Sequence, residues 1–252
     1  MQFLRLPLSA VLLAASGPLL LGADGIISIF GEGSVSPLHY ERDTDFAPVS
    51  GTPIAPQATS DDTRDQAYRL GLTLLIRIPT TTPFRPTVGA SMGYQYIFNS
   101  MGNAAPPPVA GTPPPPVTAP EPTSRYRGTM RTYDIFGGVS FFASSNVIFD
   151  LLIYSGVGEG SATSNESRAD YSNQTFDPSL KMKEWGLRLA VNFVSDRGMT
   201  LAVFGGIQSS RITEDGLQID TPASGGAPST AARSDYTLYK GGTAGLGLGY
   251  TF

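Results

Sequence analysis

The feature that most constrains the fold is a strict alternation of side chains at the end of the chain, in residues 235–252. From Ala244 to Phe252 every second residue is apolar or aromatic, and the residues between them are glycine or threonine. A period of two is typical of a β-strand whose two faces meet different surroundings. A strand of a soluble sandwich can alternate in the same way, so this stretch alone does not separate a soluble protein from a membrane protein.

The alternation recurs along the chain and predicts about eight strands. They are expected at residues 25–33, 67–78, 86–98, 129–142, 147–157, 182–194, 199–211 and 235–252. Most of these segments are long enough for a tilted membrane-crossing strand, which needs about 9 to 11 residues. A typical soluble strand has only about five or six residues. The lengths therefore favour strands that cross a bilayer.

The connections between the predicted strands alternate between long and short. The long ones are predicted at residues 34–66, 99–128, 159–180 and 212–234. In a meander this places every short turn at one rim and every long loop at the other, which is typical of outer-membrane barrels. The predicted fold is therefore all-β, an eight-stranded antiparallel up-and-down transmembrane β-barrel. Its first and last strands are expected to pair, because an open sheet edge in hydrocarbon leaves backbone groups unpaired.

The first 23 residues are predicted to be an export signal, with the barrel at residues 24–252. Arg5 precedes an apolar run, residues 6–21, which Gly17 and Pro18 interrupt, and Ala23 offers a small residue for cleavage. A retained membrane anchor is the alternative. No later segment is apolar for the about 20 residues that a transmembrane helix needs.

Composition argues against several classes of function. The net charge of −4 gives no basic patch for nucleic acid. Cysteine is absent, which excludes disulfides and thiolate metal sites. His39 is the only histidine, and with the nearby Ser34, Ser36 and Asp43 it could be considered as an acyl-transfer site. These residues lie in a proline-rich segment, which provides no rigid strand to hold a catalytic geometry. We therefore expect no cofactor, no metal and no enzymatic activity.

The export signal, the alternating strands and loops, and the terminal Tyr250-Thr251-Phe252 together resemble the small outer-membrane β-barrel superfamily of OmpX and the OmpA transmembrane domain. The resemblance is one of pattern and covers nearly the whole mature chain. It implies a Gram-negative outer membrane, with the lipid bilayer and lipopolysaccharide as surroundings and a monomer as the state. It also implies that Tyr250 and Phe252 belong to an assembly signal that the barrel-assembly machinery reads.

Aromatic residues gather near the ends of the predicted strands, as the girdles of a membrane barrel do. Tyr68, Tyr94, Tyr96, Phe98, Tyr133 and Trp185 fall near the long-loop ends, and Phe141, Phe149, Phe193, Tyr250 and Phe252 near the short-turn ends. The long loop at residues 34–66 is rich in acidic side chains. It is expected to be solvated, with divalent-cation bridging to lipopolysaccharide as the alternative.

If the apolar faces point to lipid, the other faces carry charges into the lumen. These charges are Glu32, Arg69, Arg77, Asp134, Asp150, Glu184 and Arg188. Since the interior of an eight-stranded barrel is just wide enough for side chains, the charges are expected to pair. Arg77 and Asp150 are predicted in the half nearer the short turns and the other five nearer the long loops, with Gln95, Asn192 and Gln208 joining them. A gated ion path through the same residues is the alternative to a structural plug.

The sequence thus predicts an integral outer-membrane barrel of structural or surface-interaction type with a closed polar lumen. A narrow channel or an OmpW-like carrier of small apolar molecules is one alternative. A secreted lipocalin-like binding barrel is the other.

Overall fold

The computed structural model describes residues 26–47, 64–102, 123–167, 173–221 and 227–252, of which 37–47, 64–65, 99–102, 123–125 and 166–167 are described by backbone alone. These ranges contain nine strands. Their bounds are β1 Ile27–Ala47, β2 Arg64–Arg77, β3 Phe84–Gly102, β4 Thr123–Ser144, β5 Val147–Ser167, β6 Asn173–Phe176, β7 Ser179–Val194, β8 Met199–Thr221 and β9 Ser229–Thr251. In this part of the chain no helix is both long and apolar enough to cross a membrane.

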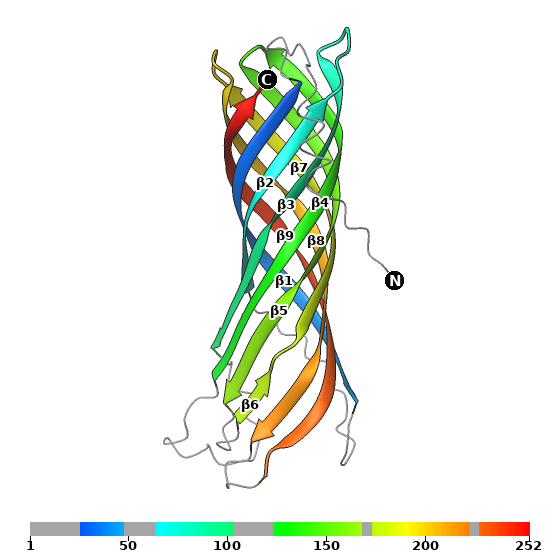
Figure 1. The fold of residues 1–252 in the computed structure, drawn as a ribbon, viewed down its shortest axis with the longest axis vertical. Coiled ribbons are helices and arrows are strands. Elements are labelled where there is room, and N and C mark those ends of the chain that lie inside the picture. The colour runs from blue at the N-terminus through cyan, green and yellow to red at the C-terminus, as the bar shows by residue number, and fades with distance from the viewer. Residues whose placement is uncertain (1–25, 48–63, 103–122, 168–172, 222–226) are drawn as a thin grey trace, which may run out of the picture.

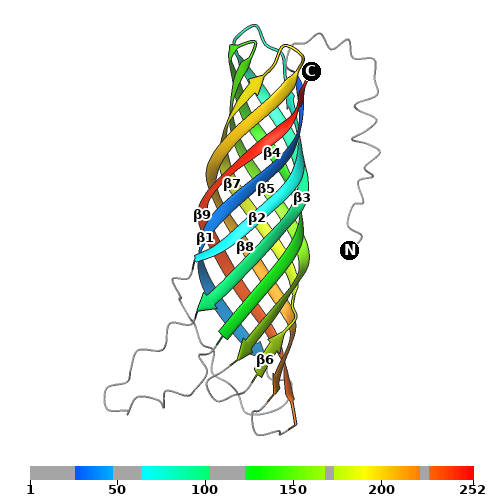
Figure 2. The same cartoon turned by 90° about the vertical axis from the view of Figure 1, so that its left-hand side faces the viewer.

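The strands form one antiparallel sheet that closes on itself. Each strand from β1 to β5 pairs with the next, β5 pairs with β7, and β7, β8 and β9 follow in order. The ring closes between β1 and β9, in register from Ser28 opposite Thr251 to Ala47 opposite Ala232. Figure 1 and Figure 2 show the resulting tall cylinder, with the C-terminus at the rim of the short turns. The predicted closed, all-β, up-and-down barrel is confirmed.

The short strand β6 adds a ninth strand but no ninth position around the ring. It lies between β5 and β8, with Asn173 opposite both Ser167 and Thr221. β7 occupies the same position around the ring nearer the short turns, and the backbone oxygen of Pro178 still accepts a hydrogen bond of 3.0 Å from Ala162. The ring therefore has the eight positions that were predicted, and the stretch around Pro178 divides one of its long strands into two.

The strands are much longer at one rim than predicted. At the short turns their ends lie within two residues of the predicted ones, and β5, β7 and β8 begin or end at Val147, Val194 and Met199 as expected. At the other rim they continue into segments predicted as loops. The residues that are strand instead of loop are 34–47, 64–66, 99–102, 123–128, 159–167, 173–176, 179–180, 212–221 and 229–234. The predicted long-loop bounds were wrong to that extent.

The two faces of the strands exchange character part-way along the barrel. On β7 the side chains from Trp185 to Phe193 alternate between apolar outward and polar or small inward positions. Beyond Trp185 the order inverts, since Lys181 and Lys183 face outward while Leu180 and Met182 are buried inside. We call the part with the apolar exterior, up to Trp185 on β7, the apolar-faced zone and the remainder the polar-faced zone.

The same inversion occurs on the neighbouring strands. On β4 the outward residues change from Tyr133 to Arg131, and Met130 is buried inside. On β5 they change from Val157 to Glu159, and Ala162 is buried inside. A polar exterior over an apolar interior is the arrangement that water favours, because apolar area is then removed from solvent. It has the opposite sense to a membrane strand, which explains why these extensions read as polar loops in the sequence.

Large apolar side chains cover the exterior of the apolar-faced zone. On β7 this face runs from Phe193 to Trp185, which at about 3.3 Å per residue is about 26 Å along the strand. A strand tilt of about 40° reduces that length to a height of about 20 Å, near the roughly 25 Å apolar band of membrane barrels. Exposed aromatic residues bound it at both edges: Tyr68, Tyr94, Phe98, Tyr133 and Trp185 toward the long connections, and Phe84, Phe149, Phe193, Tyr250 and Phe252 toward the short turns. We call the side of the long connections upper and that of the short turns lower; Figure 1 draws the barrel the other way up.

Candidate functional site

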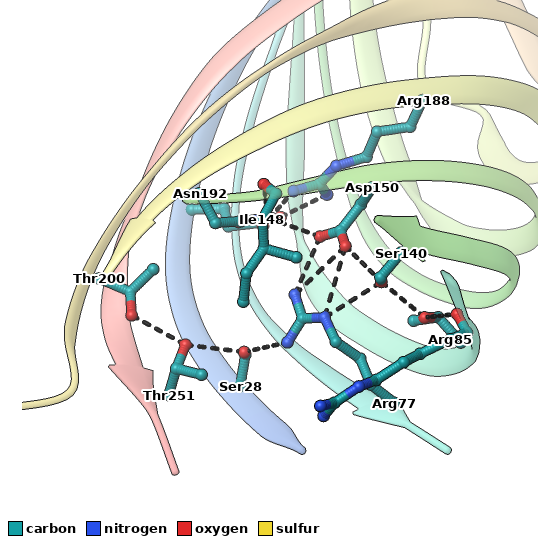
Figure 3. Close-up of polar contacts among 12 residues, drawn as sticks. Ser28, Arg77, Arg85, Ser140, Ile148, Asp150, Arg188, Asn192, Thr200 and Thr251 are labelled. Carbon is teal, nitrogen blue, oxygen red and sulfur yellow. Dashed lines mark hydrogen bonds and ion pairs between the residues drawn. The ribbon is translucent and has the colours of Figure 1, made fainter. Parts of the chain in front are cut away.

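The lumen is filled by alternating polar and apolar layers. The layer nearest the short turns, the turn-side polar layer, is built around Arg77, whose side chain is 0% exposed. Its Nη2 lies 3.0 Å from Asp150 Oδ2, and its Nε donates to Ser140 Oγ at 3.1 Å. Asp150 also accepts from Asn192 Nδ2 at 2.7 Å, so the ion pair is embedded in neutral hydrogen bonds (Figure 3).

A chain of hydroxyl groups extends this layer to the closing seam of the barrel. Arg77 Nη1 donates to Ser28 Oγ at 2.5 Å, Ser28 and Thr251 hydroxyls lie 2.8 Å apart, and Thr200 donates to Thr251 at 2.8 Å. Figure 3 shows these groups reaching from β2 across β1 to β9 and β8. The polar atoms of the layer therefore connect the two strands that complete the ring.

An apolar layer lies directly above the turn-side polar layer. It consists of Phe30, Leu75, Phe136, Leu152, Tyr154 and Ala202, which come from five different strands. Phe30, Leu75 and Leu152 are at most 1% exposed. This layer was not predicted, although the alternation already places Phe30 and Leu75 on the inward face. The inward positions of these apolar residues thus follow from the alternation, although the seven inward charges indicated a wholly polar lumen.

The middle polar layer contains the other five predicted charges. Arg69 binds two carboxylates, Asp134 at 3.0 Å and Glu184 at 2.5 Å, and also donates to Gln95 Oε1 at 2.8 Å. Arg188 binds Glu32 through both terminal nitrogens, and its guanidinium lies 3.8 Å from the centroid of the Phe204 ring. Bidentate contact with a carboxylate is the geometry for which a planar guanidinium is suited.

A small cavity remains beside these charges. It has a volume of about 60 Å³ and is lined by Glu32, Arg69, Asp134, Tyr154 and Arg188 among others. Asp134 Oδ1 and Arg188 Nε are buried and have no hydrogen-bond partner among the described residues. A volume of this size accommodates a few water molecules, whereas sites for small organic ligands have about 300 to 1,000 Å³.

A second apolar layer lies above the middle polar layer, inside the polar-faced zone. Its members are Ala67, Ile97, Tyr126, Met130, Ala162, Leu180, Met182, Ile212 and Tyr239. Near the mouth the interior becomes polar again, where Tyr126 donates to Glu214 at 2.8 Å and Arg233 pairs with Asp235 at 2.7 Å. The cavity of the middle layer thus lies between two apolar layers.

The structure brings the seven predicted lumen charges together in two ion pairs and one triad, as described above. Arg77 and Asp150 occupy the layer nearer the short turns, and Glu32, Arg69, Asp134, Glu184 and Arg188 the layer above it. Of the three amides expected to join them, Gln95 binds Arg69 and Asn192 binds Asp150, while Gln208 accepts from Ser36 at 3.4 Å.

Other predicted features lie partly outside the described residues. The signal segment, residues 1–23, and the side chains of His39 and Asp43 are outside them. Ser34 and Ser36 are described, and they lie on β1 beside the lumen cavity rather than in a loop at the rim. Among the described side chains, none form a group of three or more that could hold a metal ion. Tyr250 and Phe252 lie together at the short-turn rim, with ring centroids 4.7 Å apart.

Comparison with known proteins gives similarity only to solved structures. No protein-family model matches the chain, and no curated protein matches it. A major outer membrane protein from Thermus thermophilus is 10% identical over 87% of this chain and 98% of that chain, with a TM-score of 0.43. The outer membrane protease OmpT from Escherichia coli is 12% identical over 90% and 95%, also with a TM-score of 0.43. Ail, the attachment invasion locus protein of Yersinia pestis, is 12% identical over 88% and 99%, with a TM-score of 0.25. TM-scores this low say nothing about the activity of this chain.

Proposed function

We propose that the protein is an integral β-barrel of the bacterial outer membrane with a closed lumen, and that it acts as a structural or surface-interaction protein. The observation that carries the proposal is the exterior of the apolar-faced zone, where residues such as Leu70, Ile135 and Leu248 are each at least 60% exposed. An apolar belt of this extent around a whole cylinder would be unfavourable in water and is favourable in hydrocarbon. The aromatic edges of the belt and the closure between β1 and β9 support the same conclusion.

The layered interior supports a closed rather than a conducting barrel. Ions would have to pass the layer of Phe30, Leu75 and Leu152 and then the layer of Ile97, Met130 and Leu180, all of which are fully buried. Between and below these layers the charges are bound to one another, so the network serves as a structural plug. Removing ions from water into such a path is costly.

The two alternative functions are less well supported. A carrier of small apolar molecules needs a site several times larger than the cavity of about 60 Å³. A secreted lipocalin-like barrel would place its apolar residues inside and its polar residues outside, which in this chain describes the polar-faced zone alone. No catalytic role is included in the proposal.

The partners that we propose follow from this location. The apolar-faced zone would contact the bilayer as a monomer, since closure leaves no sheet edge for pairing with another copy. The outward pair Tyr250 and Phe252, at the end of the closing strand, is the proposed signal for the barrel-assembly machinery. Lipopolysaccharide is the proposed neighbour at the long-loop side.

Two measurements test the proposal. The purified protein, refolded in detergent, should migrate differently on a gel before and after boiling, and it should insert into lipid vesicles. In planar bilayers the wild type should show no unitary conductance, and Asp150→Asn should leave the barrel closed because both apolar layers remain. A regular conductance that changes in Asp150→Asn would favour the ion path. Failure to insert into lipid would contradict the proposal as a whole.

A further inference from the structure

A group of cations lies on the exterior of the barrel, immediately above the apolar belt. Arg131 on β4, Lys181 and Lys183 on β7, and Arg211 on β8 all face outward and are exposed. We call these four residues the cationic cluster. Lys240 on β9, diagonal to Arg211, also faces outward and is exposed, whereas the outward side chains that the structure describes on β1, β2 and β3 at this height include no lysine or arginine. The cations therefore gather on one side of the cylinder.

The register of the strands places the four cations close together. Lys183 is directly opposite Arg211, and Lys181 is one outward position further along β7. Glu159 on β5 is opposite both Lys181 and Arg131, so those two cations are separated by two strand spacings. With about 5 Å between strands and about 7 Å between alternate residues of a strand, the backbone positions fit in a patch about 10 to 15 Å across.

The cluster is not neutralised by the protein around it. Glu159 is the one acidic side chain among these positions, and no ion pair joins any of the four cations to another described residue. Like charges directly opposite each other, as in Lys183 and Arg211, destabilise a sheet. Arg211 is held against the Tyr236 ring, 3.9 Å from its centroid, which fixes the guanidinium at the surface. An anionic ligand would relieve this repulsion.

The position of the cluster selects the kind of ligand. Trp185 follows Lys183 by two residues on the same face and is 61% exposed, and Tyr133 follows Arg131 in the same way. These aromatic residues form the edge of the belt, which in a membrane barrel lies at the level of the lipid headgroups. The cations therefore stand where the phosphate groups of the adjoining leaflet would be.

We propose that the cationic cluster is a binding site for the phosphate groups of a phosphorylated glycolipid in the outer leaflet. This inference rests on the proposed outer-membrane location. Lysine ammonium groups act as point charges for phosphate, and an arginine fork can bind two of its oxygens. Trp185 and Tyr133, directly below, would contact the sugar and the first carbons of the acyl chains.

The experiment uses the full barrel in uncharged detergent and titrates it with a bisphosphorylated glucosamine-disaccharide glycolipid. Trp185 is the only tryptophan of the chain, so its fluorescence reports events beside the cluster. The same glycolipid without its phosphates is the second probe. Lys181→Gln with Lys183→Gln removes two charges, and adding Arg131→Gln and Arg211→Gln removes all four. Arg197→Gln, in the short turn at the opposite rim, is the matched control.

Binding of the phosphorylated probe should weaken about fivefold for each charge removed, hence about 25-fold in the double variant, and should fall with added salt. The control variant should bind as the wild type does. Native mass spectrometry of the same mixtures checks the result where a substitution alters the fluorescence of Trp185. Equal binding of the two probes, or an unchanged affinity in the fourfold variant, would overturn the inference. If the barrel inserts into vesicles and one of these two results is found, only the phosphate site is contradicted. If the barrel does not insert into vesicles, the proposed function is contradicted.

Discussion

The charged residues in the lumen differ in how much their substitution would lower the free energy of unfolding. Arg77 is 0% exposed and has Asp150 as its carboxylate partner, also 0% exposed. The middle polar layer instead has three carboxylates, Glu32, Asp134 and Glu184, for two guanidinium groups, and Arg69 binds two of them. One carboxyl group is therefore in surplus over the guanidinium groups, and Asp134 Oδ1 has no hydrogen-bond partner in the described part of the chain.

We therefore predict that Asp150→Asn destabilises the barrel more than Asp134→Asn does. The first change leaves a fully buried arginine without a carboxylate, which costs about 3 to 5 kcal/mol. The second replaces the surplus carboxyl group while Arg69 keeps Glu184, so the free energy of unfolding should change by less than about 1 kcal/mol. Urea unfolding of the refolded barrels in lipid measures both. Equal losses in the two variants would show that the charge imbalance has no energetic consequence.

A pair of glycines on β2 and β3 faces the lumen where backbone atoms leave no room for a side chain. Gly71 lies opposite Gly93, and a Cβ on Gly71 would be 2.6 Å from the backbone oxygen of Met92 and 3.1 Å from the Cα of Gly93. Because these neighbours are backbone atoms, the strands would have to move. Gly71→Ala should lower the free energy of unfolding by about 1 to 3 kcal/mol.

Gly137 provides the matched control for this substitution. It faces outward on β4, and a Cβ there would meet no atom within 4 Å. Gly137→Ala should leave stability unchanged or raise it slightly, since alanine restricts the unfolded chain more than glycine does. The two unfolding midpoints, measured in the same lipid, compare a crowded inward site with an open outward one. A similar loss in both variants would mean that the close approach at Gly71 is not limiting.

At the scale of the strands, the sequence predicted the apolar-faced zone well because a single rule, large apolar side chains on the outward face, holds along each strand there. Outward residues such as Leu187 and Leu189 are apolar, charges such as Arg188 occur on the inward face, and tight turns such as Ser195–Gly198 end the strands. The short-turn ends were therefore placed within two residues. The same parity identified the seven inward charges.

The polar-faced zone could not be predicted by that rule. Its strands alternate in the opposite sense, and β5 shows why this is hard to recognise in sequence. Its outward residues there are Glu159, Ser161 and Thr163, and its inward ones begin with Gly158 and Gly160. Glycine inside and hydroxyl groups outside have the composition of a loop. The strand is maintained by pairing with β4 and by the apolar layer around Met130 and Met182, which only the folded ring brings together.

The inversion predicts where the surface of the membrane lies on β7. The chain has no cysteine, so single substitutions give clean reporters. Lys183→Cys, just above the belt, should react quickly with a charged, water-soluble maleimide when the barrel is in lipid vesicles. Leu189→Cys, an outward position within the belt, should react far more slowly, because lipid excludes both water and reagent.

Met182→Cys tests whether labelling depends on the face that a residue occupies or only on its height along the barrel. It adjoins Lys183 but faces the apolar layer of the lumen and is 2% exposed, so it should also stay unlabelled. After unfolding in denaturant all three variants should label equally. Rapid labelling of Leu189→Cys in the folded barrel would contradict the position of the belt, and rapid labelling of Met182→Cys would contradict the dry upper layer.

At the scale of the whole molecule, the proposed location predicts that folding in a bilayer depends on closing the ring rather than on any one strand. The last residues carry this closure, since Tyr250 is opposite both Ile29 on β1 and Met199 on β8. The Phe252 amide donates to the backbone oxygen of Ile27 at 2.8 Å. Without these residues, the lower ends of β1 and β8 would present unpaired backbone groups to hydrocarbon, at several kcal/mol for each group.

Deleting residues 249–252 should therefore prevent formation of the compact barrel even when the chain is refolded from urea into lipid, where no assembly machinery takes part. The matched control removes more residues but none of the β1–β9 pairs: a short turn replaces residues 218–231 between β8 and β9, in the polar-faced zone. This variant should still migrate as a heat-modifiable species, because its backbone outside the belt can bond to water. Migration on gels before and after boiling reads out both. A truncated chain that folds normally would show that the seam between β1 and β9 does not control closure, and the dependence of the fold on hydrocarbon would have to be abandoned with it.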